Sequence, residues 1–185
     1  MERLRERKAV SARLLEFIIL TAARSSEASG ARWPEIDNGV KVWTVPASRM
    51  KGSRKHRVPL SPRAMDILEE MEKGKVSDFV FPATKRLRSL SNMATDMLLR
   101  RMKAGEVTTH GFRSSFRDWA GEFTGFPREV AEAALAHSVG DETELAYRRG
   151  DALEKRRKLM VAWANYCDKK PGANVLEPKF GKAPS

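Results

Sequence analysis

The sequence predicts an α+β fold, mainly α, in which a helical domain carries a small three-stranded antiparallel sheet in its N-terminal third. Apolar residues recur at helical spacing over most of the chain, whereas alternation with a period of two is confined to residues 33–60. Asn38-Gly39 stands between two alternating runs and indicates a hairpin. The chain has 185 residues, 41% of them apolar, which is enough for one domain with a real core.

The N-terminal third is expected to contain a buried helix followed by the sheet. The stretch SARLLEFIILTAA (11–23) is rich in apolar residues, and Ser11 is its expected N-cap. Residues 25–33 predict a short helix or turn. Two strands flank Asn38-Gly39, and HRVPLS (56–61) predicts a third. The basic, Gly-containing turn ASRMKGSRK (47–55) joins the last two strands and gives the sheet a cationic tip.

Three helices follow the sheet, and the third carries an aromatic stripe. The stretch SPRAMDILEEMEKG (61–74) has Ser61 as its N-cap, Pro62 at the first helical position and Gly74 as its stop. Residues 90–103 predict another helix. A third, at 109–123, has a stripe that is expected to face the core. The stripe consists of Phe112, Phe116, Trp119 and Phe123.

Three further helices and a tail complete the chain. Pro127 is expected at the first position of one helix, Asp141 caps a short one, and Asp151 with Glu154 opens the last as a capping-box-like pair. The last helix carries Leu159, Trp163 and Tyr166 on one stripe. That stripe packs on its own core or on a neighbouring subunit, and the spacing favours the first. The tail 171–185, rich in Pro, Gly and Lys, is expected to be flexible.

The composition points to an anionic partner. Lys and Arg number 35 against 24 Asp and Glu, a formal net charge of +11, which indicates nucleic acid more than a basic but otherwise ordinary enzyme. The single cysteine, Cys167, excludes a disulfide framework or Cys-rich zinc site and fits a reducing cytoplasm. The charged N-terminus does not resemble a signal peptide, and the longest apolar run, FIIL, is too short to span a membrane.

Several polar residues stand where folding does not require them. Each also has an ordinary explanation: a helix-end cation for Arg24, a surface lysine for Lys51, an N-terminal cap for His110, a satisfied helix-end histidine for His137 and a packing tyrosine for Tyr147. His110 and Arg113 are three residues apart, so a helix would place them on one face at its N-terminus, where an anion binds favourably.

Taken together and in order, these residues resemble the catalytic domain of the tyrosine recombinases, the phage integrase family. The boxes read TAARSSE (21–27), MKGSRKHRVPL (50–60), HGFR (110–113), LAH (135–137) and AYRRGD (146–151). The resemblance runs from about Val10 to Lys169 and is greatest to integrases of satellite phages and genomic islands. Ala22 stands where the family usually has Gly, and Ser114 where Arg or Thr is common; neither change removes a functional group.

The resemblance implies site-specific DNA cleavage and rejoining through a 3′-phosphotyrosyl intermediate, for integration or excision of a mobile element, without metal, cofactor or ATP. Tyr147 would be the nucleophile, and Arg24, Arg113 and His137 would bind the phosphate oxygens. His110 would accept the phenol proton and Lys51 would protonate the leaving oxygen. Glu27 would orient Arg24 from behind. Contacts to DNA phosphates are expected from Arg49, Arg54, Lys55 and Arg57. His56 is expected to be a surface or phosphate contact and not a catalyst.

The resemblance also sets expectations for organisation and partners. Residues 1–170 would be the catalytic domain, with the core- and arm-binding domains that usually precede it absent from this chain. The partner would be double-stranded DNA at attachment sites in a bacterial cytoplasm, with no membrane involvement. The full-length protein would form a homotetramer on DNA, and this chain alone a monomer. Three alternatives stay open: a non-catalytic DNA-binding remnant of an integrase, a type IB topoisomerase-like activity, and a basic helical adaptor for protein partners.

Overall fold

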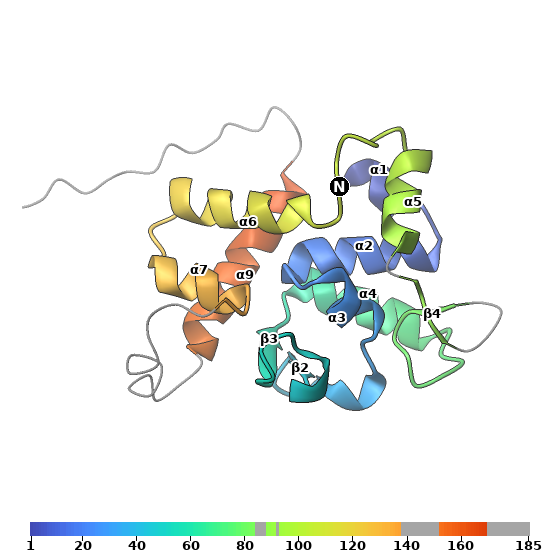
Figure 1. Cartoon of the computed structure of the whole chain (residues 1–185), viewed down its shortest axis with the longest axis horizontal. Coiled ribbons are helices and arrows are strands. Elements are labelled where there is room, and N and C mark those ends of the chain that lie inside the picture. Colours follow the sequence, from blue (N-terminus) through green and yellow to red (C-terminus); the bar gives the residue numbers. More distant parts are fainter. Residues whose placement is uncertain (84–87, 92, 138–151, 170–185) are drawn as a thin grey trace, which may run out of the picture.

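The computed structural model describes residues 1–83, 88–91, 93–137 and 152–169. It confirms a mainly helical fold with one three-stranded antiparallel sheet (Figure 1). In chain order the elements are α1 (Glu2–Arg5), α2 (Val10–Thr21), α3 (Ser25–Ser29), η1 (Trp33–Glu35), β1 (Ile36–Asp37), β2 (Val42–Val45), η2 (Ala47–Arg49), β3 (His56–Pro59), α4 (Pro62–Glu72), β4 (Pro82–Ala83), β5 (Arg88–Ser89), α5 (Met93–Arg101), α6 (Gly111–Glu122), α7 (Arg128–Ala134) and α9 (Leu153–Asp168).

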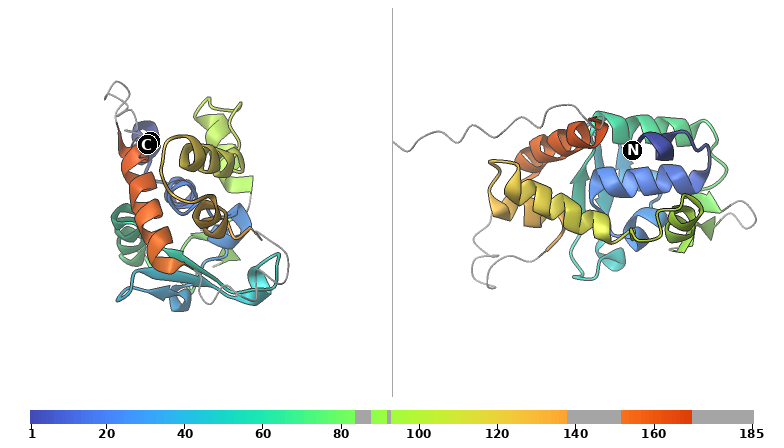
Figure 2. Two further views of the ribbon diagram at one scale, coloured as in Figure 1. Left: turned by 90° about the vertical axis from the view of Figure 1, so that its left-hand side faces the viewer. Right: turned by 90° about the horizontal axis from the view of Figure 1, so that it is seen from above.

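Helix α2 is the central element, and it is buried on all sides (Figures 1 and 2). One of its faces, including Leu15 and Ile19, belongs to a core shared with α5, α6, α7 and α9. The opposite face, including Phe17 and Ile18, belongs to a second core shared with the sheet and α4. The prediction of a buried helix at 11–23 is therefore confirmed, and its apolar residues lie on opposite faces because they belong to two cores instead of one.

The sheet has the order β1-β2-β3, with Trp43 of β2 opposite Ile36 of β1 and Val58 of β3. Pro59 is tolerated because β3 is an edge strand. The Asn38-Gly39 signal located the first hairpin correctly. The loop, however, covers residues 38–41, and its left-handed residue is Lys41, with φ of 53°. The small β4–β5 hairpin was not predicted.

Helices α6, α7 and α9 form one side of the molecule (Figure 1). The Trp163 indole of α9 lies 5.4 Å from the Phe116 ring and 5.0 Å from the Trp119 ring of α6, centroid to centroid, and its N–H donates to the Ile19 carbonyl at 2.7 Å. Leu159 and Trp163 of the α9 stripe thus face their own core, as predicted, whereas Tyr166 at its edge is exposed.

Three helix ends and one residue of the aromatic stripe can be compared with the predictions. Ser11 does not cap α2, because the helix begins at Val10 with Ala9 in the N-cap position. Pro127 is the N-cap of α7 and not its first helical residue. Phe123 lies beyond the end of α6 and is exposed, so it drops out of the core stripe. Ser61 does cap α4, its hydroxyl accepting from the Ala64 N–H at 3.3 Å.

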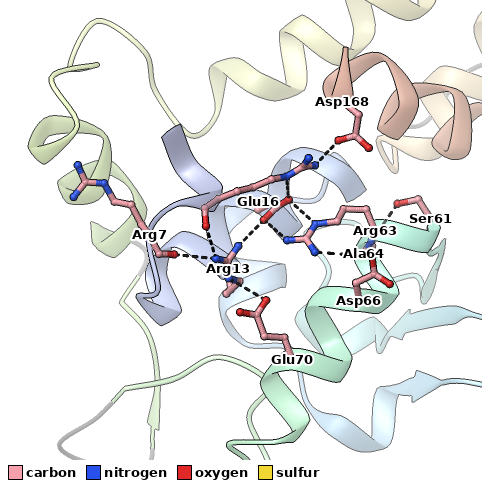
Figure 3. Close-up of polar contacts among 10 residues, drawn as sticks. Arg7, Arg13, Glu16, Ser61, Arg63, Ala64, Asp66, Glu70 and Asp168 are labelled. Atoms are coloured by element: carbon pink, nitrogen blue, oxygen red, sulfur yellow. Dashed lines mark hydrogen bonds and ion pairs between the residues drawn. The ribbon is translucent and has the colours of Figure 1, made fainter. Parts of the chain in front are cut away.

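A cluster of arginines around a buried carboxylate joins four helices (Figure 3). Glu16 of α2 is 0% exposed and accepts hydrogen bonds from Arg5 of α1 at 2.6 Å, from Arg13 of α2 at 2.9 Å and from Arg63 of α4 at 2.9 Å. Arg5 also pairs with Asp168 of α9. The first and last helices that the structure describes are therefore held on the same charged cluster.

The elements predicted at Asp141 and Asp151, and the tail 171–185, lie outside the described residues. Within the described part of the chain, no helix has the length and apolar character needed to cross a membrane.

Candidate active site

Arg24 is positioned by the end of α2 and the start of α3. Helix α2 stops where Ala22 adopts a left-handed conformation with φ of 49°, and Arg24 becomes the extended N-cap of α3. The buried Glu27 carboxylate accepts from the Arg24 backbone N–H at 3.0 Å and from its guanidinium at 2.7 Å. This double contact fixes both the backbone and the direction of the guanidinium, as expected for an orienting carboxylate.

Arg113 comes from the first turn of α6 and is only 5% exposed. The start of α6 is held by Thr108, whose hydroxyl accepts from the Gly111 N–H at 3.0 Å. The Arg113 guanidinium donates to the carbonyls of Ala22 and of Leu135, the latter at 2.8 Å. Burial and the nearby positive charge of Arg24 lower the pKa of Arg113 to about 10, with Glu27 acting in the opposite direction. The two arginines therefore form a cationic site, and a bound anion would reduce the repulsion between their charges.

His137 is placed by the turn that ends α7. Ala136 is left-handed with φ of 51°, the His137 N–H donates to the Glu132 carbonyl at 2.9 Å, and the Ala136 N–H donates to the Ala133 carbonyl at 3.2 Å. This pair of bonds is the Schellman ending of a helix. It turns the His137 imidazole back over α7, where Nδ1 lies 2.7 Å from the Glu132 carboxylate and Nε2 lies 3.4 Å from the Arg113 guanidinium.

The tip between β2 and β3 lies beside this turn. A surface cavity of about 280 Å³ is lined on one side by residues of the tip and on the other by Ala136 and His137. Lys51 itself is exposed at the tip. Arg54 and Lys55 line the cavity, whereas Arg49 is held at the base by the Glu35 carboxylate and the Glu27 carbonyl at 2.9 Å. Arg49 thus anchors the base of the tip to α3 and η1.

His56 lies closer to the site, and is more buried, than the sequence suggested. It is partly buried on β3, and its ring is hydrogen-bonded to the Ala134 backbone. Burial and the positive charges of Arg156 and Arg113 lower the pKa of His56 to about 4, against smaller opposing effects of Glu27 and Ala134. A surface position for His56 was therefore wrong: the ring is a neutral link between β3 and the end of α7.

The fold thus brings some of the predicted site residues close together and leaves others apart. Arg24 is hydrogen-bonded to Glu27, Nε2 of His137 lies 3.4 Å from the Arg113 guanidinium, and the charges of the first pair act on Arg113. His110 is exposed at the N-cap of α6. Tyr147 lies outside the described residues. Sequence reasoning missed Glu132, whose only signal was a carboxylate five residues before His137.

Comparison with known proteins identifies the family of this chain. The model of the phage integrase family matches residues 1–154, which is most of the chain. The chain belongs to the phage integrase family. It is 42% identical over 155 residues to the prophage integrase IntA of Escherichia coli (strain K12), a match that covers 82% of this chain and 37% of IntA. This family member therefore spans well under half the length of that relative.

Solved structures of other integrases share the fold. The integrase from mycobacterium phage Brujita gives a TM-score of 0.66 at 19% identity, over 86% of this chain and 54% of that one. A lambda integrase tetramer bound to a Holliday junction gives a TM-score of 0.55 at 17% identity, over 76% of this chain and 42% of that one. At these identities the likeness concerns the fold alone.

Proposed function

We propose that this chain is the catalytic domain of a site-specific DNA recombinase that cuts and rejoins strands through a 3′-phosphotyrosyl intermediate. The observation that carries the proposal is the convergence of Arg24, Arg113 and His137 from three separate segments onto one cationic site. Guanidinium groups bind phosphate oxygens in bidentate fashion, and their contribution grows as negative charge grows in the transition state.

The chemistry is a substitution at phosphorus. The Tyr147 phenol oxygen forms a bond to a DNA phosphorus while the bond to the 5′-oxygen breaks, and the reverse attack by a 5′-hydroxyl rejoins the strand. In this proposal His110 accepts the phenol proton and Lys51, at the exposed tip, donates a proton to the leaving oxygen. The ester bond is exchanged and not hydrolysed, so the reaction needs no nucleotide.

The DNA would lie across the face that carries the tip. Arg54 and Lys55 line the cavity beside His137, and with Arg57 they would contact backbone phosphates. Arg49 would act indirectly, by holding the base of the tip. By analogy with the lambda integrase tetramer bound to a Holliday junction, the full-length protein would work as a tetramer on DNA. It would act in the bacterial cytoplasm.

A trapping experiment tests the proposal. The chain is incubated with a pool of duplexes that carry a nick beside a randomised core, so that the small 5′-hydroxylated fragment diffuses away after cleavage. We expect a protein–DNA adduct that survives denaturant and disappears in Tyr147→Phe. DNA binding without any adduct would instead identify a non-catalytic remnant, and relaxation of supercoiled plasmid without sequence enrichment would identify a topoisomerase-like activity.

A further inference from the structure

Glu132 is a buried carboxylate beside the proposed phosphate site, and its side chain is 7% exposed. One oxygen accepts from the Arg117 guanidinium at 2.8 Å and lies 3.7 Å from that of Arg128. The other oxygen lies 2.7 Å from Nδ1 of His137. Every partner of this carboxylate among the described residues is thus a cation or a histidine, which is the arrangement of an ionised acceptor.

The ionised state of Glu132 follows from these contacts. Burial acts to raise the pKa of Glu132, but hydrogen bonds from Arg117 and His137 outweigh it and hold that pKa below the usual range. An ionised carboxylate has no proton to donate, so Nδ1 of His137 must be the donor in this contact.

This contact determines what the other ring nitrogen can do. With Nδ1 protonated, a neutral His137 has Nε2 free to accept, and Nε2 lies 3.4 Å from the Arg113 guanidinium, which can only donate. A phosphate oxygen in the same place accepts hydrogen bonds, so Nε2 must then carry a proton as well. A His137 ring that donates to a phosphate through Nε2 while Nδ1 donates to Glu132 carries two protons, and the Glu132 carboxylate lies where it would stabilise that charge.

We propose that Glu132 is a positioning residue for strand cleavage: it holds Nε2 of His137 toward the phosphate and keeps the ring cationic while the phosphate is bound. The proposal rests on the proposed function, because it requires His137 to contact the scissile phosphate. Other titratable groups surround this pair. Arg113 of α6 and, from the tip and β3, Arg54, Lys55 and the neutral His56 lie near the ring, and Arg117 of α6 and Arg128 of α7 lie against the Glu132 carboxylate. Glu132 is the carboxylate among them that contacts the ring.

The first experiment measures adduct formation across pH in Glu132→Gln. The amide oxygen still accepts from Nδ1, but the negative charge is gone. We expect a rate near that of the unmodified chain at low pH and a loss of about 10- to 100-fold at alkaline pH, because a hydrogen bond to a charged group contributes on that order. Glu129→Gln is the matched control, since Glu129 is exposed in the first turn of the same helix, and it should leave the profile unchanged. Equal profiles for Glu132→Gln and the unmodified chain would overturn the proposal.

The second experiment separates this inference from the proposed function. The chain has three histidines, so nitrogen NMR of the imidazole rings resolves which nitrogen of His137 carries the proton without any DNA. We expect the Nδ1–H form in the unmodified chain, in Glu132→Gln and in Glu129→Gln, and its loss in Glu132→Ala. If no variant forms an adduct but this pattern holds, the positioning contact stands and the proposed function fails. If Glu132→Ala keeps the Nδ1–H form, the positioning role is wrong. Should Glu132→Ala not fold, Arg117→Ala tests the same contact, because it removes the arginine that holds the Glu132 carboxylate.

Discussion

Arg113 shows why the two arginines of the site are not interchangeable with lysine. Its guanidinium reaches the carbonyls of Ala22 and Leu135 at once, and these belong to segments 113 residues apart in the chain. A lysine ammonium is a single point charge on a flexible stem and cannot hold both carbonyls while also presenting a flat edge to a phosphate.

We therefore expect Arg113→Lys to slow adduct formation by about 10²- to 10³-fold, the usual cost of removing one positioned transition-state donor. The measurement is the single-turnover rate of adduct formation, with urea unfolding to confirm that the variant is folded. Arg100→Lys, at an exposed position of α5, is the control and should keep its rate. A folded Arg113→Lys variant that reacts as fast as the control would remove Arg113 from the phosphate site.

His56 gives the protein a pH dependence of its own. Its pKa is lowered to about 4 in the folded state, against an ordinary 6.5, because the ring is partly buried and lies within the field of the Arg156 charge. The unfolded chain therefore binds a proton between these values that the folded chain does not, so stability is complete above pH 6.5 and falls as the pH drops toward 4. The shift corresponds to roughly 3 kcal/mol at most.

We expect His56→Asn to flatten this part of the stability curve, because an asparagine side chain does not titrate but keeps a polar group beside the Ala134 backbone. Urea unfolding at pH 7 and at pH 5 measures the difference. The interval is chosen to lie above the range in which carboxylates such as Glu16 and Glu132 gain protons. An equal loss of stability in both proteins over this interval would mean that His56 is not the titrating group.

At the scale of elements, two helices end in a left-handed alanine directly before the site. Ala22 ends α2 two residues before Arg24, and Ala136 follows α7 one residue before His137. An alanine in this conformation costs about 1 kcal/mol more than a glycine, because its Cβ crowds the next carbonyl. The strain lies where the backbone must turn sharply to present a functional side chain.

Replacing Ala136 by glycine should therefore stabilise the protein, by about 0.5–1 kcal/mol. Ala136 is only partly buried, so little packing is lost with its methyl group, whereas Ala22 is in the core and is a less clean test. The measurement is the urea midpoint at constant slope. Ala133→Gly, within α7, is the control and should destabilise by about 1 kcal/mol. A loss of stability in both variants would show that the left-handed turn carries no strain.

The same elements show how far the sequence determines the site. Alternation around Asn38-Gly39 and the Ser61-Pro62 start of α4 are local signals, and both elements were correctly placed from them. The contact of Glu132 with His137 is different in kind: a separation of five residues does not align side chains on a helix, and the pair meets only because Ala136 reverses the chain. Arg49 was likewise grouped with the DNA contacts because its neighbours are basic, and only the fold places Glu35 beside it.

For the whole molecule, the site depends on two cores being held in register along α2. Arg24 and the tip adjoin residues of the core shared with the sheet, whereas Arg113 and His137 adjoin residues of the core shared with α6 and α7. Arg156 of α9 donates to the Arg57 carbonyl of β3 at 2.6 Å and so ties one half to the other. The charged cluster around Glu16 has a similar role, because it fastens α1, α4 and α9 to α2 (Figure 3).

This role makes the Glu16 carboxylate important for the stability of the fold. Burial acts to raise the pKa of Glu16, but hydrogen bonds from Arg63 and Arg5 outweigh it and hold that pKa below its usual value, so Glu16 is ionised at neutral pH. Truncation to alanine leaves the buried Arg13 guanidinium with the carbonyls of Arg5 and Arg7 and with the exposed Glu70 carboxylate. It also removes the central acceptor of Arg5 and Arg63.

We expect Glu16→Ala to lower the free energy of unfolding by about 3–5 kcal/mol, as is usual when one partner of a buried ion pair is removed. Glu70→Ala is the matched control: it removes the other carboxylate on Arg13, 3.2 Å from Nε, but Glu70 is 51% exposed, so its loss should cost less than about 1 kcal/mol. Urea unfolding of both variants at pH 7 measures the difference. Equal effects of the two substitutions would mean that α1 and α9 are held by apolar packing alone and that the charged cluster contributes little to joining them.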